Sequence, residues 1–135
     1  PLKRAHRLAT GCAPTPLQHA VSEALQLPAS HFTAISETFQ QQRDFLVDAL
    51  HNVGLHASKP QGGFFTLVQI DTSQWPDASE FCRYLIKEIG VAALPAVNFY
   101  QDQALGSVTV RFSFFRNQDA LQAASERLAK LADKT

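Results

Sequence analysis

A strand-like stretch near the carboxyl end, SVTVRFSFF at residues 107–115, constrains the fold of this chain most strongly. In an extended chain successive side chains point to opposite faces, so apolar residues at every second position share one face. The residues of the stretch that do so are Val108, Val110, Phe112 and Phe114. Arg111 lies in the middle of the stretch and on the opposite face. The alternation therefore predicts a sheet strand with a buried apolar face and an arginine on the other face.

Apolar residues at helical spacing predict helices on both sides of this strand. Thr15 followed by Pro16 is typical of a helix start, and Gly54 and Gly90 are typical of helix ends. Ser30 is the predicted cap of the second helix. The predicted helices span residues 15–28, 34–53 and 77–89, and a last one begins at Asn117 or Asp119.

The remaining segments predict strands. LHASK at 55–59 and FFTLVQI at 64–70, joined by PQGG, predict an antiparallel hairpin, and VAAL at 91–94 predicts a further strand that ends at Pro95. The resulting order, ααββαββα, is typical of an α+β domain with a small, mainly antiparallel sheet covered by helices. We expect residues 1–135 to form a single domain of this class.

Charge and cysteine content narrow the class of protein. Lys plus Arg and Asp plus Glu number 12 each, so no net field attracts nucleic acid or an anionic membrane. No apolar run is long enough for a transmembrane helix, and the amino end lacks the apolar centre of a signal peptide. The sparse cysteines favour a reducing, cytoplasmic setting. Because the first residue is proline and the chain has no methionine, we expect a fragment or a processed product.

Histidine and cysteine residues do not form a recognisable reactive or metal-binding pattern. The five histidines include no pair at the i, i+4 spacing that places two ligands on one helix face. Cys12 and Cys82 have no adjacent base in the sequence that could activate a thiol. PQGG joins two strands and does not open a helix, so it predicts a turn and not a phosphate-binding loop. We therefore predict no metal site and no nucleophilic cysteine.

Arg111 needs a partner if it is buried, because a guanidinium group loses its hydration there. Its planar fork matches a carboxylate through two parallel hydrogen bonds. The residues alone favour an internal salt bridge or a solvated sheet face, since arginine side chains are mostly exposed or paired. A bound carboxylate ligand is the alternative.

Five sequence blocks, in this order, cover nearly the whole chain: APTPLQHAVSEAL, QQQRDFLVDAL, PQGGFFTLVQID, EFCRYLIKEIGVAALPAVNFY and VRFSFFRNQDALQAASERL. Together they resemble the carboxy-terminal third of class I/II pyridoxal-phosphate (PLP) aminotransferases, and most of all the kynurenine, glutamine and methionine aminotransferase branch. The resemblance implies the small domain of the aspartate-aminotransferase-like fold, with the large cofactor-binding domain absent from this chain.

The resemblance also implies an activity. Such an enzyme moves an amino group between an amino acid and a 2-oxo acid by way of PLP, in amino acid metabolism and biosynthesis. It acts as a cytoplasmic homodimer with shared active sites, and it has no nucleic-acid or membrane partner. For residues 1–135 this implies one part of a transferase rather than the whole catalyst.

Within the resemblance, Arg111 stands in the position of the arginine that clamps the substrate α-carboxylate, which reverses the preference for a salt bridge. Gly11 and Cys12 match a substrate-proximal region that reaches toward the partner subunit, although relatives often carry an aromatic residue or histidine there. The Schiff-base lysine lies upstream of the matched region. The resemblance therefore implies no catalytic and no cofactor-binding residue in this chain, and we expect the isolated chain to be inactive.

A second hypothesis belongs to a different class of function. In it, the chain is a truncated, noncatalytic module that keeps the fold and acts through self-association or interaction. Such a module should expose the apolar patch that otherwise meets a large domain, and a second copy could cover that patch.

Overall fold

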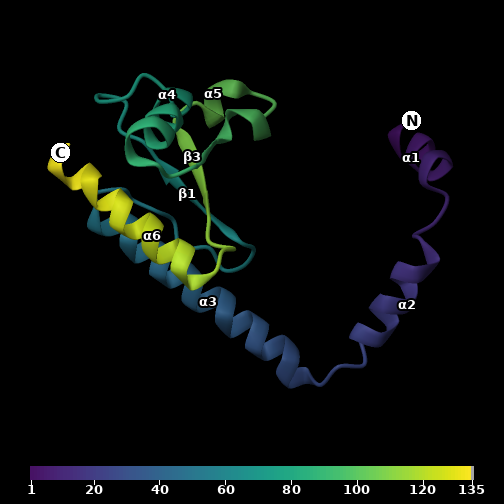
Figure 1. Cartoon of the computed structure of the whole chain (residues 1–135). Coiled ribbons are helices and arrows are strands. Elements are labelled where there is room, and N and C mark those ends of the chain that lie inside the picture. Colours follow the sequence, from purple (N-terminus) through teal and green to yellow (C-terminus); the bar gives the residue numbers. More distant parts are fainter. Residues whose placement is uncertain (135) are drawn as a thin grey trace. The chain divides into compact units, whose positions relative to one another are not determined.

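The computed structural model describes residues 1–134, and the chain divides into two compact units, Pro1–Ile35 and Ser36–Thr135. Helix α3 (Ala29–Asn52) begins in the first unit and continues into the second. Figure 1 gives the order of the elements along the chain. We describe each unit by itself.

The first unit is helical. Helix α1 (Leu2–Thr10) ends at Gly11, whose φ of 60° lies in the left-handed region that glycine adopts without steric cost. Helix α2 (Thr15–Ala24) has Pro16 in its first turn, and its N-cap position is Pro14, one residue before the predicted cap and without a side-chain cap hydrogen bond. The sequence analysis missed α1, although its apolar residues recur at helical spacing. It also extended α2 too far toward Pro28.

The first unit exposes its large apolar side chains. Leu2, Leu8 and Leu25 are 86%, 80% and 73% exposed, although leucine contributes most to stability when it is buried. The other exposed large apolar residues of this unit are Leu17, Val21, Leu27, Phe32 and Ile35. These helices present apolar surface that nothing within their own unit covers.

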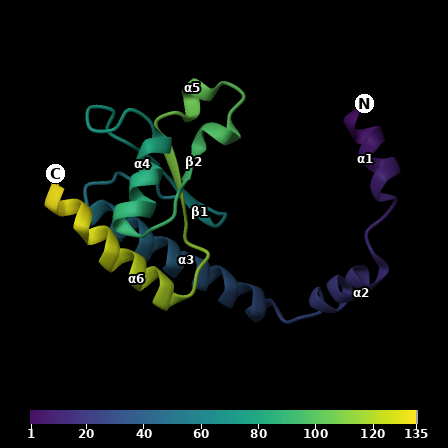
Figure 2. The same cartoon turned by 45° about the horizontal axis from the view of Figure 1, so that its top comes forward.

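The second unit contains the core. The carboxyl-terminal part of α3 lies side by side with α6 (Gln118–Leu128), as both views show (Figures 1 and 2). Helix α6 is capped by Asn117, whose side chain accepts a hydrogen bond from the Ala120 amide at 2.9 Å. It continues as the 3₁₀ turn η3 (Ala129–Lys134). The predicted last helix and its start at Asn117 are thereby confirmed.

The sheet has three strands in the order β1-β3-β2, and both pairings are antiparallel. Strand β3 (Thr109–Ser113) lies in the centre, between β1 (Phe65–Gln69) and the short β2 (Leu94–Pro95). The stretch at residues 107–115, on which the fold prediction was based, therefore contains the central strand. With the helices around it, this small antiparallel sheet confirms the predicted α+β class.

One predicted strand is not formed, so the predicted hairpin is wrong, and another strand is shorter than expected. LHASK at 55–59 forms no strand and contributes only an isolated bridge between Ala57 and Val68. The pairing stops because Pro60 soon follows, and proline has no N–H to donate. In VAAL only Leu94 joins the sheet, since the Val91 amide instead donates to the Leu85 carbonyl at 3.0 Å.

Helix α4 (Ala78–Tyr84) begins at Asp77, whose Oδ1 accepts hydrogen bonds from the amides of Ser79 and Glu80 at 2.7 and 2.9 Å. It runs into a π-helical turn, η1 (Leu85–Ile89), and Gly90 ends it at a φ of 78°. The predicted helix over 77–89 is confirmed apart from this widened last turn. Two short helices, η2 (Ala96–Phe99) and α5 (Gln103–Gly106), follow β2 and were not predicted.

The hydrophobic core lies on one face of the sheet. It is built from helix residues and from Val68, Val110, Phe112 and Phe114 of the strands and their ends. Its largest fully buried side chains include Phe81, Phe114, Leu50, Leu85 and Leu128. Among the described residues, none of the helices combines the length and the apolar character needed to cross a bilayer.

Candidate functional site

Arg111 lies on the sheet face that points away from the core. Its strand neighbours Val110 and Phe112 are 0% and 3% exposed, whereas Arg111 itself is half-buried. In the register of the sheet, Arg111 is opposite Leu67 of β1 and Leu94 of β2. The predicted alternation is therefore confirmed, and Arg111 lies at the centre of the second face.

Aromatic side chains form a hollow of about 430 Å³ around Arg111. Strand β1 and the residue before it supply one side of the hollow, and the η2 segment supplies the other. The pairing of Leu94 with Arg111 explains this arrangement, because it brings the residues that follow β2 alongside β3. The lining residues are Phe64, Phe65, Leu67, Ala96, Phe99, Tyr100 and Arg111.

The Arg111 guanidinium rests against three aromatic rings. Its Cζ lies over the Phe65 ring at 4.4 Å from the centroid, and at 5.3 and 5.4 Å from the centroids of Phe64 and Phe99. These separations are within the range of about 6 Å in which a cation is attracted to a ring face.

Arg111 has no anionic partner among the described residues. Its Nε is buried and without a hydrogen bond. The ion pairs in residues 1–134 join other side chains: Arg43 and Lys59 to Asp44, and Arg83 to Glu80. A buried guanidinium N–H that lacks an acceptor carries a desolvation cost, which a carboxylate would remove. The internal salt bridge that the residues alone favoured is thus not formed here.

Two further arginines, Arg116 and Arg127, border a different hollow, and both already donate hydrogen bonds to backbone carbonyls. The Nη1 atom of Arg127 donates to the Gly90 carbonyl at 2.8 Å, and that of Arg116 donates to the Phe115 carbonyl at 2.7 Å. Both side chains are exposed. An anion gains less there, because these groups are hydrated and partly satisfied.

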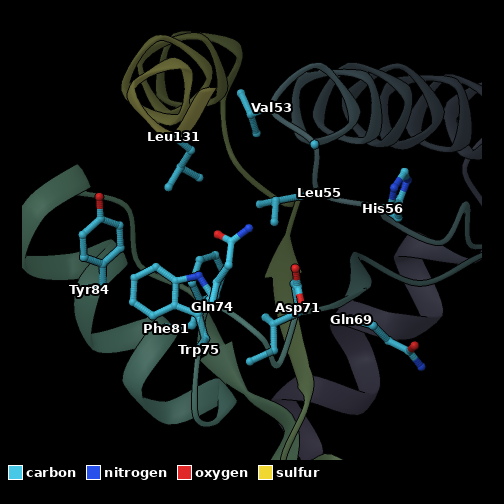
Figure 3. A pocket seen from close by; sticks show the side chains of 12 residues that line it. Val53, Leu55, His56, Gln69, Asp71, Gln74, Trp75, Phe81, Tyr84 and Leu131 are labelled. Carbon is cyan, nitrogen blue, oxygen red and sulfur yellow. The ribbon is translucent and has the colours of Figure 1, made fainter. Parts of the chain in front are cut away.

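A hollow of about 410 Å³ between α4 and the ends of α3 and β1 has the opposite electrostatic character. Trp75, Phe81 and Tyr84 gather on its α4 side, and Leu131 lies across from them (Figure 3). Its formally charged lining residue is Asp71, and the hydrogen bond from the Ser73 amide to Asp71 Oδ1 at 2.8 Å lowers the pKa of that carboxyl. This hollow therefore repels a carboxylate, and the Arg111 hollow attracts one.

Gly11 and Cys12, the other predicted substrate-binding residues, lie between α1 and α2 in the first unit. Gly11 adopts the positive φ given above, and Cys12 is exposed. Their contact with substrate stays a prediction.

Comparison with known proteins identifies the family. The profile of the family described as Aminotransferase class I and II matches residues 2–128. The chain belongs to this family. It is 33% identical over 130 residues to a methionine aminotransferase of Escherichia coli K12, covering 96% of this chain and 33% of that protein. It is 32% identical over 146 residues to a kynurenine–oxoglutarate transaminase of Dictyostelium discoideum, covering 93% of this chain and 34% of that protein.

Solved structures of aminotransferases have the same fold. The crystal structure of YbdL from Escherichia coli, described as identifying a methionine aminotransferase function, matches with a TM-score of 0.79 and 34% identity over 94% of this chain and 33% of that one. N-succinyldiaminopimelate aminotransferase from Mycobacterium tuberculosis matches with a TM-score of 0.82 and 28% identity, covering 93% of this chain and 33% of that one. The predicted aspartate-aminotransferase-like fold is confirmed. This aminotransferase chain spans about a third of the length of these relatives.

The class I and II family implies PLP as cofactor, and the residues around Arg111 do not fit it. A PLP site needs a lysine amine for the cofactor aldehyde. The lining of the Arg111 hollow contains no lysine and, besides Arg111, only apolar and aromatic residues. The hollow in this aminotransferase chain therefore offers a guanidinium group to an anion and no amine to the cofactor aldehyde.

Sequence reasoning singled out Arg111 as a candidate and missed the aromatic residues that surround it. Phe64 and Phe65 were predicted as part of the strand over 64–70, and neither they nor Phe99 was predicted to lie near Arg111. The signal that marks Phe65 is its position in β1, two register positions from Arg111 and on the same face, which is visible only once the strand register is known.

The two cysteines of the chain differ sharply in environment, and we expect them to differ in reactivity. Cys82 is 4% exposed, and its burial raises the pKa of the thiol to about 11, whereas Cys12 is exposed. Because the thiolate is the nucleophile, Cys82 stays protonated and unreactive at neutral pH. Iodoacetamide at pH 8 should label Cys12 at least about 100-fold faster in the purified native chain, as mass spectrometry can measure.

Denaturant provides the control for this prediction, since both thiols should react at similar rates once the core is unfolded. Equal rates in the native chain would show that the core around Cys82 opens readily. That result would contradict the packing of α4 described above.

Proposed function

We propose that this chain is part of a PLP-dependent aminotransferase that moves an amino group between an amino acid and a 2-oxo acid, and that Arg111 binds the substrate α-carboxylate. The observation that supports the proposal is a half-buried arginine with an unpaired Nε in an aromatic hollow. An amino acid carboxylate supplies the missing acceptor in a geometry that matches the guanidinium fork.

In this proposal Arg111 acts by orientation. Two parallel hydrogen bonds from its guanidinium hold the carboxylate in one plane and fix how the rest of the substrate is presented. The low polarity of Phe64, Phe65 and Phe99 strengthens the ion pair, because charges interact more strongly where water is excluded. When it is bound, PLP supplies the electron-withdrawing ring that amino transfer requires.

The remaining parts of the proposal concern the longer polypeptide, which we call the complete enzyme. We propose that it holds the cofactor and its lysine, and that it works as a cytoplasmic homodimer. The curated relatives include methionine and kynurenine aminotransferases, so we propose amino acids with apolar or aromatic side chains as donors.

A substrate that lacks its carboxylate tests the proposal. The complete enzyme, assayed with PLP and 2-oxoglutarate, should convert methionine or kynurenine far faster than the matching decarboxylated amines. The loss should be about 100-fold or more in kcat/KM, because a buried guanidinium is left unpaired. Equal turnover of amine and amino acid would contradict carboxylate recognition.

Self-association is the second candidate function, and the exposed apolar residues of the first unit favour it. In both candidates this surface is covered, either by the rest of an enzyme or by a second copy of the chain. Sedimentation of the purified chain, which measures its oligomeric state, distinguishes the two candidate functions. A chain that stays monomeric at high concentration would contradict self-association.

A further inference from the structure

Phe65 lies diagonally across from Arg111 on the same face of the sheet. Phe65 is paired with Ser113, and Leu67 is paired with Arg111, so Phe65 and Arg111 are diagonal neighbours on one face of an antiparallel pair. Diagonal neighbours are within reach of aromatic and long side chains. The Arg111 Cζ lies nearer to the Phe65 ring, at 4.4 Å, than to the Phe64 and Phe99 rings.

Phe65 is also the most firmly held of the three rings. It belongs to a strand that is hydrogen-bonded to β3 and is half-buried, whereas Phe64 and Phe99 are 45% and 60% exposed. A cation–π contact is stronger where water is excluded from the ring face. Phe65 therefore contributes the more persistent contact.

An aromatic face attracts the guanidinium without offering it a carboxylate acceptor. An internal Asp or Glu would use the N–H donors of Arg111 and compete with a ligand, whereas a ring holds the cation through its charge. A long, flexible side chain loses rotamer freedom when it binds. A ring that already restricts the Arg111 side chain lowers this entropic cost of binding and leaves the guanidinium N–H donors available to a ligand. Arg111 is then preorganised for binding.

We propose that Phe65 is a positioning residue, whose ring holds the Arg111 guanidinium in the orientation that receives a carboxylate. This inference rests on the proposed function of Arg111. Phe65 acts through Arg111 and not on the substrate, so its effect requires the arginine to be present.

The test uses three variants of the complete enzyme. Phe65→Leu keeps an apolar side chain and removes the ring, Phe65→Tyr keeps the ring, and Phe115→Leu removes a ring that stacks on Phe39 at 5.3 Å and lies outside the hollow. We expect Phe65→Leu to raise KM for the amino acid between about twofold and thirtyfold, with a much smaller change in kcat. Phe65→Tyr should retain near-normal KM, and so should Phe115→Leu.

A double-mutant cycle shows whether Phe65 acts through Arg111. In the Arg111→Ala background, Phe65→Leu should cause no further loss of kcat/KM, because the group that it positions is gone. A full additional loss in that background would overturn the proposal, since Phe65 would then act on the substrate or on the fold. An equal loss from Phe65→Leu and Phe65→Tyr would overturn it as well.

The same measurements distinguish failure of this inference from failure of the proposed function. If Arg111→Ala lowers kcat/KM strongly and Phe65→Leu does not, the clamp stands and positioning by Phe65 is wrong. If Arg111→Ala itself has no effect, the carboxylate clamp is wrong, and the inference falls with it.

Discussion

Replacing Arg111 with lysine in the complete enzyme should lower kcat/KM for the amino acid by about 100- to 1,000-fold, or roughly 3 to 4 kcal/mol of transition-state stabilisation. A lysine ammonium is a compact point charge, and it cannot form the two parallel hydrogen bonds of the fork. It is also more strongly hydrated, so holding it in the aromatic hollow costs more. Steady-state kinetics over a range of amino acid concentrations measures the effect.

Arg116→Lys is the matched control for this prediction, because Arg116 is exposed and bonds to the backbone outside the Arg111 hollow. Its kinetics should be nearly unchanged. The Tm should change little in Arg111→Lys, since Arg111 has no ion pair to lose among the described residues. Unchanged kinetics in Arg111→Lys would contradict the carboxylate role, and a large fall in Tm would mean that the arginine is structural.

Replacing Gly106 with alanine should destabilise the second unit by about 3 kcal/mol, at the upper end of the usual cost of overpacking. Gly106 is buried, and a Cβ there would lie 2.6 Å from the backbone N and Cα of Val97 and 2.8 Å from the Ala96 carbonyl carbon. Backbone atoms cannot move aside as the end of a flexible side chain can. Urea unfolding of the purified chain, followed by circular dichroism, measures the loss.

Gly106→Ala should also weaken substrate binding in the complete enzyme, because the displaced backbone belongs to η2, which forms one side of the Arg111 hollow. Gly62→Ala is the control, since a Cβ at Gly62 meets nothing within 4 Å. The control should stay within about 0.5 kcal/mol of the parent chain. If both variants have the same stability, the close approach of Gly106 to Val97 is wrong.

Elements with a strong local signal were predictable from the sequence. The helix over 77–89 has a capping aspartate and a closing glycine, and both act within a few residues of the helix end. The central strand was predictable because alternation with period two is a property of neighbouring residues. Helix α1, which buries none of its residues, was missed by the sequence analysis although Leu2, Ala5 and Ala9 recur at helical spacing.

Strand lengths were less predictable, because a strand depends on its partner as well as on its own residues. LHASK has a plausible strand composition, yet only Ala57 is bridged to β1. In VAAL the end of the π-helical turn competes with the sheet for the Val91 amide. Context of this kind outweighs intrinsic strand preference.

The sequence by itself determined which face of the strand carries Arg111, because the pleat of an extended chain is local and Val110 and Phe112 on either side are apolar. Only the tertiary structure decided that no described carboxylate pairs with Arg111 and that Phe65 and Phe99 surround it. Those contacts follow from the pairing of β1 and β2 with β3. Strand register depends on matching the apolar faces of two strands that lie far apart in the chain, so it cannot be obtained from either strand alone.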